Sequence, residues 1–331
     1  MNSTKYIYII LVAAAMNIGI QVEQAIANDS VAGYGIGGIT LQQTNSIKMI
    51  SEVLKISDTN INIDYIFKNI SASDITTIVA FPLPDLNMQM VYFHPHEFSN
   101  EGYANFVNFK IFVDSKEVVP LVEVRSFLEN GNEITDILKK LNVNPFQRDL
   151  KGTKLRAELQ KIAAIDDKYD AAQWTTKTHF FWSQTFPAGK ELKVHHSYHP
   201  IPWKGLVSAN VDDNKEWCVD ESIIIATDKL AETNKDYKPD GYVRGESVSY
   251  ILKTGANWAG PIDDFTLILE KAGADFISTC PIPGITLERQ GNNFVGHAKN
   301  YTPTSNLNIL FIKPFNYYWP DKLKNADPNS R

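Results

Sequence analysis

The sequence predicts a mainly β fold with two antiparallel, β-sandwich-like halves joined by a short helical segment. From residue 37 to about residue 128, apolar and polar side chains alternate with a period of two, which is typical of strands that bury one face. Apolar residues then recur at helical spacing up to about residue 163, and the period of two returns from Lys177. The expected organisation is a signal peptide at residues 1–27, an N-terminal β-sandwich domain at 28–130, a helical linker at 131–170, a C-terminal β-rich domain at 171–325 and a polar tail at 326–331.

In the N-terminal half, the alternation is clearest where Ile61, Ile63, Tyr65 and Phe67 stand between polar residues. Turn-forming polar stretches separate this run from similar ones, and close turns between short strands favour an antiparallel sandwich. The strands expected in this half lie at residues 61–67, 75–83, 91–98, 106–113 and 118–128.

The middle segment carries two runs of apolar residues at helical spacing, at residues 134–141 and 155–163. Pro145 separates them because proline cannot continue a helix, and Thr153 is placed to cap the second. We therefore expect two short helices between the β-rich halves.

In the C-terminal half, Phe-Pro-Ala-Gly-Lys at residues 186–190 is typical of a hairpin tip joining strands at 178–185 and 191–198, since proline presets the turn and glycine accepts a positive φ. Asp220 is expected to cap a helix that runs to about Leu230. Further strands are expected at residues 248–253, 265–270, 276–280, 285–289, 294–298 and 307–312.

Composition excludes two classes of protein. Of the 331 residues, 44% are hydrophobic, and 32 basic against 38 acidic side chains give a net charge of −6. A disordered chain would combine low hydrophobicity with high net charge, so this chain is expected to fold. Binding to nucleic acid or to an anionic membrane requires clustered Lys and Arg, so neither partner is expected.

The N-terminus has the features of an export signal. Lys5 precedes an apolar run at residues 6–16, and a more polar stretch ends in Ala25, Ile26 and Ala27. Small residues at the third and first positions before a cut after Ala27 fit signal peptidase. The run is shorter than the ~20 residues that a membrane-spanning helix requires. We expect the mature protein to be periplasmic or extracellular, with no membrane span after signal cleavage.

Cys218 and Cys280 are the only cysteines. In an oxidising compartment they are expected to form a disulfide, which the chain-entropy model credits with ~4 kcal/mol for a ring of this length. The alternative is two separate buried thiols.

Three motifs carry possible site chemistry. Residues 33–38 match Gly-x-Gly-x-x-Gly, but a dinucleotide site needs a preceding strand and a following helix, so we assign them to a flexible segment that leads into a strand. His94 and His96, beside Glu97, are the candidate metal ligands, although Pro95 between them favours exposed histidines on an edge strand.

A second group of histidines is His195, His196 and His199. On a strand, His195 and His199 share a face but lie roughly 13 Å apart, too far for one metal ion, and His196 points to the other face. We expect structural or surface roles for them.

Other signatures of catalysis are weak. No Gly-x-Ser-x-Gly elbow and no calcium loop occur in the sequence. The carboxylate pairs at residues 212–213 and 263–264 stand in turn-like contexts. All six tryptophans fall in the C-terminal half, where burial in a sandwich core is the default and a ligand groove is the alternative.

Several segments together resemble one bacterial family, the domain of unknown function 4424 (DUF4424) family. They are Asn-Asp-Ser at residues 28–30 with glycines at 37–38 and leucine at 41, Ile-Lys-Met at 47–49 with glutamate at 52, Val-Ala-Phe-Pro-Leu-Pro-Asp at 79–85, Trp-Ser-Gln-Thr-Phe-Pro-Ala-Gly at 182–189, His-Ser-Tyr-His-Pro at 196–200, and Thr-Gly-Ala-Asn-Trp-Ala-Gly-Pro-Ile at 254–262 followed by phenylalanine at 265. The resemblance implies an exported bacterial protein with a β-rich fold. It implies no reaction and no catalytic residue.

These observations predict an exported, non-enzymatic binding protein whose partner is an unknown envelope protein or a small ligand. No catalytic residue, cofactor-binding residue or cofactor is assigned. One alternative is an envelope hydrolase, metal-assisted through His94 and His96 or through His195, His196 and His199. The other alternative is a structural or assembly subunit of an envelope complex.

Overall fold

A computed structural model describes residues 28–35, 38–89, 105–147, 150, 153–166, 168, 171–207, 211–233 and 243–313 of the chain. Within these residues the strands form three sheets, and the mainly β prediction is confirmed. No helix in the described ranges combines the length and the apolar character needed to cross a bilayer.

The first sheet is six-stranded and antiparallel. It contains β1 (Ser30–Gly35), β2 (Gly38–Gln42), β5 (Ile75–Pro82), β6 (Leu86–Asn87), β9 (Leu121–Leu128) and β10 (Trp174–Phe186). Its order is β2-β1-β5-β10-β6, and β9 also pairs with β10.

The second sheet is eight-stranded. It contains β3 (Ile47–Ile56), β4 (Ile61–Asn69), β7 (Lys110–Val113), β8 (Lys116–Val118), β11 (Glu191–Tyr198), β14 (Ile262–Glu270), β16 (Glu288–Gln290) and β17 (Asn293–Tyr301). Its order is β16-β17-β14-β3-β4-β11-β7-β8. The β3–β14 pair is parallel and the other pairs are antiparallel.

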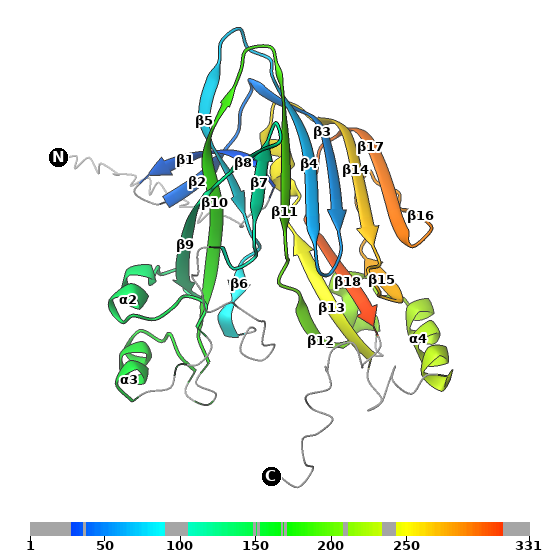
Figure 1. The fold of residues 1–331 in the computed structure, drawn as a ribbon. Helices are drawn as coiled ribbons and strands as arrows, with labels where there is room; N and C mark the ends of the chain where they lie inside the picture. Colours follow the sequence, from blue (N-terminus) through cyan, green and yellow to red (C-terminus); the bar gives the residue numbers. More distant parts are fainter. Residues whose placement is uncertain are drawn as a thin grey trace, which may run out of the picture.

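The third sheet is four-stranded and antiparallel, in the order β12-β13-β18-β15. Its strands are β12 (Trp203–Val207), β13 (Val243–Tyr250), β15 (Phe276–Thr279) and β18 (Leu307–Lys313). Figure 1 shows the two larger sheets meeting at one end of the molecule and diverging toward the other, with the four-stranded sheet beyond the lower ends of β3 and β4.

The strands of the predicted domains 28–130 and 171–325 are not kept in separate sheets. The eight-stranded sheet takes β3, β4, β7 and β8 from the first range and β11, β14, β16 and β17 from the second. The reason is physical: a period of two fixes which face of a strand is buried, but it carries no information about which strand lies beside it.

The structure corrects the predicted hairpin at residues 186–190. Gly189 has a φ of 67°, as expected for a turn. The two strands that the turn joins belong to different sheets, however: β10 pairs with β5, β6 and β9, and β11 pairs with β4 and β7. Residues 70–74 connect β4 to β5 across the same two sheets, and Ala188 N donates to Asp74 Oδ1 (2.8 Å) to tie the two connections together.

The glycine-rich segment at residues 33–38 is another correction. Instead of a flexible lead-in, its described residues belong to β1 and β2, which pair in register from Gly35 opposite Gly38. β1 also pairs with β5, so this segment is an integral part of the six-stranded sheet.

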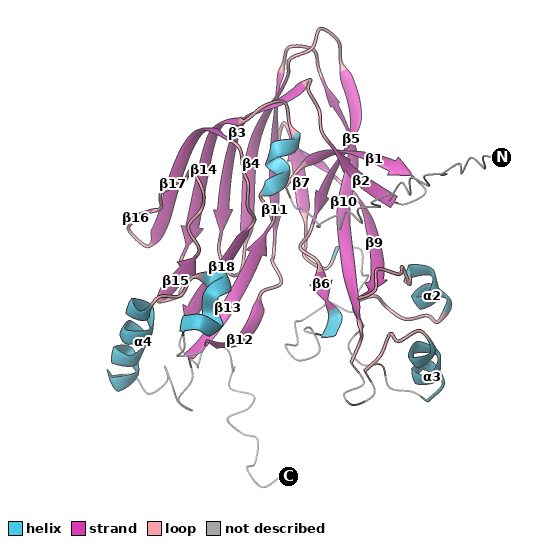
Figure 2. Cartoon of the chain, turned by 180° about the vertical axis from the view of Figure 1, so that it is seen from behind, coloured by secondary structure: helices cyan, strands magenta, loops and turns pink. Residues whose placement is uncertain are grey.

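The predicted helices form as α2 (Thr135–Lys140), α3 (Thr153–Lys161) and α4 (Glu221–Thr233). Asp220 Oδ1 accepts a hydrogen bond from Ile223 N (3.0 Å), which is the cap that the sequence predicts for α4. The side chain of Thr153 is outside the described residues. Figure 2 shows α2 and α3 at one end of β9 and β10, and α4 near β15. The described residues also include two 3₁₀ helices, η2 (Val211–Trp217) and η4 (Lys253–Asn257).

Several predicted strands differ in extent. The strand expected at 248–253 is β13, which ends at Tyr250 and gives way to η4. The strand expected at 106–113 shortens to β7, and the one at 118–128 is divided between β8 and β9. The strand expected at 91–98 lies outside the described residues.

The main core lies between the sheets and is rich in aromatic rings. Phe109 stacks between Phe81 and Phe180, with ring centroids 4.8 and 4.5 Å apart, and Phe67 packs on Trp258 at 4.5 Å. All five side chains are buried. Such rings contribute large apolar areas, so they account for much of the packing between layers that share few backbone hydrogen bonds.

Candidate functional site

A pocket opens where the six-stranded sheet faces the ends of the other two. It has a volume of about 220 Å³ and is lined by residues 83–87, 106–107, 198, 200–201 and 203, with Ser247 and Ser249 from β13. We call it the β6–β13 pocket. Leu83 N still donates to Thr178 O (2.9 Å), but Pro84 has no N–H to donate, so pairing with β10 is interrupted only briefly before β6, and residues 83–87 line the pocket.

The walls of the β6–β13 pocket are mainly apolar, with Leu83, Ile201 and Trp203 among them. One polar group stands out: the hydroxyl of Tyr198 is buried, and it has no hydrogen-bond partner among the described residues. Burial raises the pKa of Tyr198 far above its ordinary value, so the hydroxyl remains a hydrogen-bond donor at neutral pH.

Two further polar features border the pocket. The carboxylate of Asp85 lies 3.5 Å from Lys177 Nζ, and burial raises the pKa of Asp85 while the lysine opposes the rise. Ser247 Oγ accepts from Trp217 Nε1 (2.7 Å), so its oxygen is already engaged. The pocket therefore combines apolar walls with a tyrosine whose buried hydroxyl has no hydrogen-bond partner among the described residues, and with a carboxylate that pairs with Lys177.

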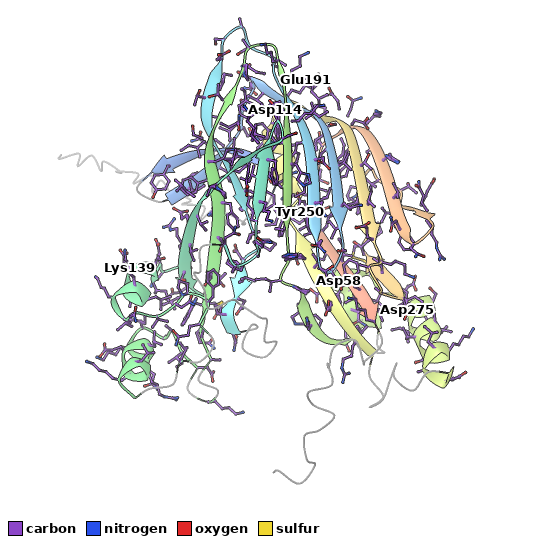
Figure 3. The ribbon with its side chains drawn as sticks, viewed as in Figure 1. Asp58, Asp114, Lys139, Glu191, Tyr250 and Asp275 are labelled. Atoms are coloured by element: carbon purple, nitrogen blue, oxygen red, sulfur yellow. A yellow bond between two sulfur atoms is a disulfide. The ribbon has the colours of Figure 1, made fainter. Side chains whose placement is uncertain are left out.

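A buried polar cluster lies deeper between the sheets. Asn28 Nδ2 donates to both carboxyl oxygens of Glu52, at 3.1 Å each, and Asn28 Oδ1 accepts from the hydroxyl of Tyr65 at 2.5 Å. Asn28, Asp29 and Glu52 are each 0% exposed. Tyr250, marked in Figure 3, belongs to the same region, since burial raises its pKa and the charge of Glu52 raises it further.

A β-bulge delivers Glu52 to this interior. The pairing of β3 with β4 shifts by one residue between Met49 and Ser51, so the buried face changes from odd to even positions. Met49 is buried before the shift, and Glu52 and Leu54 are buried after it. Without the bulge Glu52 would face solvent.

The residues around position 28 are fixed by the segment that follows β13. Trp258 Nε1 donates to the carbonyl oxygen of Asp29 (2.8 Å), and Asn257 Nδ2 donates to Ser30 Oγ (3.0 Å). The segments at 28–30 and 254–262, both part of the family resemblance, thus lie against each other. Because these contacts engage the backbone as well as the side chains, residues 28–30 have little freedom to leave the cluster.

Burial dominates the electrostatics of the cluster. It raises the pKa of Glu52 to about 8, against the opposing hydrogen bond from Asn28. The pKa of Asp29 is raised by burial and by the charge of Glu52. His196 Nε2 lies 3.5 Å from Asp29 Oδ2, yet burial lowers the pKa of His196 to about 3, so its imidazole is neutral at pH 7.

The structure separates the predicted histidine sites. His94 and His96 lie outside the described residues. His195 Nδ1 contacts Asp64 Oδ1 (2.8 Å) and His199 Nδ1 contacts the carbonyl of Thr59 (3.0 Å), both at exposed positions. His196 points inward, where the rings of Tyr65, Phe81, Phe109 and Trp182 surround it at 5.1–5.5 Å. Within the described ranges, no three His, Cys, Asp or Glu side chains gather as potential metal ligands.

Cys218 and Cys280 form the predicted disulfide, which joins the end of η2 to the end of β15. Trp174, Trp182, Trp217 and Trp258 are buried, as the core interpretation expects, and Trp203 lines the pocket. Trp319 lies outside the described residues.

Sequence reasoning did not predict that Asn28, Asp29 and Glu52 form a buried cluster. The sequence pattern placed them only within the family resemblance. A glutamate inside an apolar strand pattern was the available signal, because a buried carboxylate is rare and requires an explanation.

Comparison with solved structures gives distant similarity. A proposed nutrient-binding protein from Legionella pneumophila is 17% identical, with 86% of this chain and 72% of that chain covered and a TM-score of 0.39. An M1 zinc metallopeptidase from Deinococcus radiodurans, bound to a Tyr-Ser-Ala substrate, is 7% identical, with 82% and 44% covered and a TM-score of 0.23. Similarity at this distance assigns neither a ligand nor a reaction to this chain.

No curated protein sequence matches the chain. The family model described as domain of unknown function DUF4424 matches residues 27–310, and the chain therefore belongs to that family.

Proposed function

We propose that this protein is exported to the bacterial cell envelope and binds a small amphipathic molecule in the β6–β13 pocket, without transforming it. The signal-peptide features of residues 1–27 support export. The pocket supports binding, since enclosed apolar surfaces with a few polar groups are the usual form of small-molecule sites.

The hydroxyl of Tyr198 is the observation that carries this proposal. A buried hydroxyl without a partner costs about 1–3 kcal/mol relative to a satisfied one, and its retention at the wall of a pocket is explained if a ligand atom accepts its hydrogen bond. The ligand therefore has an acceptor oxygen or nitrogen near Tyr198.

The remaining lining defines the rest of the ligand. Leu83, Ile201 and Trp203 favour an apolar or aromatic body. Asp85 lies on the same lining and is only partly neutralised by Lys177, so a ligand amine or hydroxyl is favoured there over a carboxylate. A volume of about 220 Å³ limits the ligand to a small metabolite and excludes an oligosaccharide enclosed along its length.

The test is mass spectrometry under non-denaturing conditions on protein purified from its native envelope, followed by titration of the ligand that is identified. Tyr198→Phe removes the hydroxyl and keeps the ring. We expect it to weaken binding about 10-fold or more, the equivalent of one buried hydrogen bond.

Tyr301→Phe is the matched control. Its hydroxyl is also buried without a partner among the described residues, but it does not line the pocket, so binding should be unchanged. The assignment of the pocket would be refuted if Tyr198→Phe and Tyr301→Phe changed ligand affinity equally. It would also be refuted if neither Tyr198→Phe nor Ile201→Trp changed that affinity. Turnover of the bound molecule by the purified protein would refute the non-enzymatic part.

A further inference from the structure

We propose that the buried polar cluster is a binding site for the protein's own N-terminal ammonium group. Removal of the leader after Ala27 would create this group on Asn28, and it would then pair inside the protein with the carboxylates of Glu52 and Asp29. The inference rests on the export part of the proposed function and is independent of the β6–β13 pocket.

The geometry places the new terminus at the site. The side chain of Asn28 is already in the cluster, with Nδ2 3.1 Å from each oxygen of Glu52. The backbone nitrogen of Asn28 is four covalent bonds from Nδ2, which puts it at most about 5 Å away. Asp29 is the next residue in the chain and is equally buried. A charge on this nitrogen is therefore confined to the same interior space.

A cation is the group that the cluster lacks. Within the described part of the chain, the contacts recorded for the two carboxyl groups come from Asn28 and His196, and none comes from lysine or arginine. Among the described residues, neither oxygen of Asp29 accepts a hydrogen bond, and neither ring nitrogen of His196 forms one. Two buried carboxyl groups without a positive partner are costly, and they either take up protons or acquire a cation.

The surroundings favour the chain's own terminus over a dissolved ion. The cluster is closed to solvent, since Asn28, Asp29, Glu52 and His196 are all 0% exposed. The contacts of Asn257 and Trp258 hold residues 28–30 in place. Cleavage would therefore create the ammonium inside the cluster, whereas a dissolved ion would have to diffuse into it. The family match begins at residue 27, which agrees with a domain that starts at the proposed cut.

The chemical change at cleavage is simple. Before cleavage the nitrogen of Asn28 is part of an uncharged peptide bond to Ala27. Hydrolysis of that bond releases the leader with a carboxylate and leaves a primary amine, which takes up a proton to become an ammonium. A nearby opposite charge lowers a carboxyl pKa, so the processed protein should hold Glu52 ionised over a wider pH range than the precursor does.

The first experiment measures the reactivity of the N-terminal amine. Protein exported from the full-length gene is acetylated at pH 7, in the folded state and in urea, and its N-terminal peptide is quantified by mass spectrometry. A buried, ion-paired amine should react at least 10-fold more slowly in the folded protein. Glu52→Gln should restore much of the reactivity, whereas Glu270→Gln, at a partly exposed carboxylate paired with Lys55, should not.

A second experiment stays informative if Glu52→Gln does not fold. The acetylation rate of the wild-type protein is measured against pH, which gives the pKa of the amine. An ion pair raises that pKa above the ordinary ~7.7–8.0 of a terminal amine. The titratable groups around the cluster, which this profile has to take into account, are Asp29, Glu52, Tyr65, His196, Tyr250 and Tyr301.

The outcomes separate the two proposals. The intact mass first shows whether Asn28 is the first residue; a retained leader would refute both export as proposed and the ion pair, whereas a cut at another position would refute the ion pair alone. If Asn28 is first but its amine reacts equally fast in the folded and unfolded protein, with an ordinary pKa, the ion pair alone is refuted. Protected reactivity that Glu52→Gln relieves supports it.

Discussion

Replacing Lys313 by methionine should destabilise the protein more than any other loss of a single charge among the ion pairs described. The Lys313 side chain is 0% exposed and contacts Asp58, also 0% exposed, at the turn between β3 and β4, with Glu246 3.8 Å away (Figure 3 marks Asp58). Without the ammonium, Asp58 would be a buried carboxylate whose Oδ1 already accepts no hydrogen bond. Breaking one side of a buried pair costs about 3–5 kcal/mol.

The measurement is urea unfolding monitored by tryptophan fluorescence, with wild type and variant compared at one pH. At roughly 2–4 °C per kcal/mol, a loss of about 3–5 kcal/mol in unfolding free energy lowers the melting temperature by about 10 °C. Lys299→Met is the control, since Lys299 pairs with Asp264 at 2.6 Å but is 73% exposed, and such pairs contribute ~0–1 kcal/mol. Adding Asp58→Asn to Lys313→Met should recover part of the stability. A loss below 1 kcal/mol for Lys313→Met would refute the reasoning.

Three further predictions concern other parts of the fold. Replacing Cys218 and Cys280 by serine opens a ring with a separation of 62 residues and should cost ~4 kcal/mol, measured as the unfolding midpoint without reductant; an unchanged midpoint would contradict this. Burial lowers the pKa of His196 from 6.5 to about 3, so between these pH values the unfolded chain binds a proton that the folded protein does not. Stability should therefore fall as the pH drops from about 6.5 toward 3. In His196→Asn, the melting temperature should depend less on pH over this range. Gly38→Ala should destabilise by more than Gly131→Ala, because both have positive φ but only at Gly38 would the new Cβ lie 2.6 Å from a Glu123 oxygen; equal melting temperatures would count against this.

The sequence was sufficient for local structure. The alternation at residues 61–67 predicts β4, the helical spacing at 134–141 predicts α2, and Asp220 predicts the start of α4. These features depend on residues close together in the chain. The disulfide was also predictable, because only two cysteines exist and only one pairing is available.

The arrangement of strands was not predictable in the same way. Nothing in β3 or β14 indicates that they pair in parallel, and the turn at 187–190 has the composition of a hairpin although its strands enter different sheets. Neighbour choice depends on packing summed over the whole core, which no short window contains.

The site was predicted least well. The histidines attracted attention because imidazole is a familiar ligand and catalyst, yet His195 and His199 are exposed and His196 is enclosed by aromatic rings. The groups that matter for our proposals, Tyr198 and Glu52, are ordinary members of strand patterns. Their role depends on a bulge and on cavity shape, and neither is visible without coordinates.

The parallel pairing of β3 with β14 also governs how the chain reaches its final state during synthesis. About 200 residues separate the two strands, so a growing chain has made β3 long before its neighbour exists. Such non-local pairing slows folding because a long loop must close first. Until Ile262–Glu270 has emerged, β3 presents an unpaired edge, and such an edge is a template for pairing with another chain.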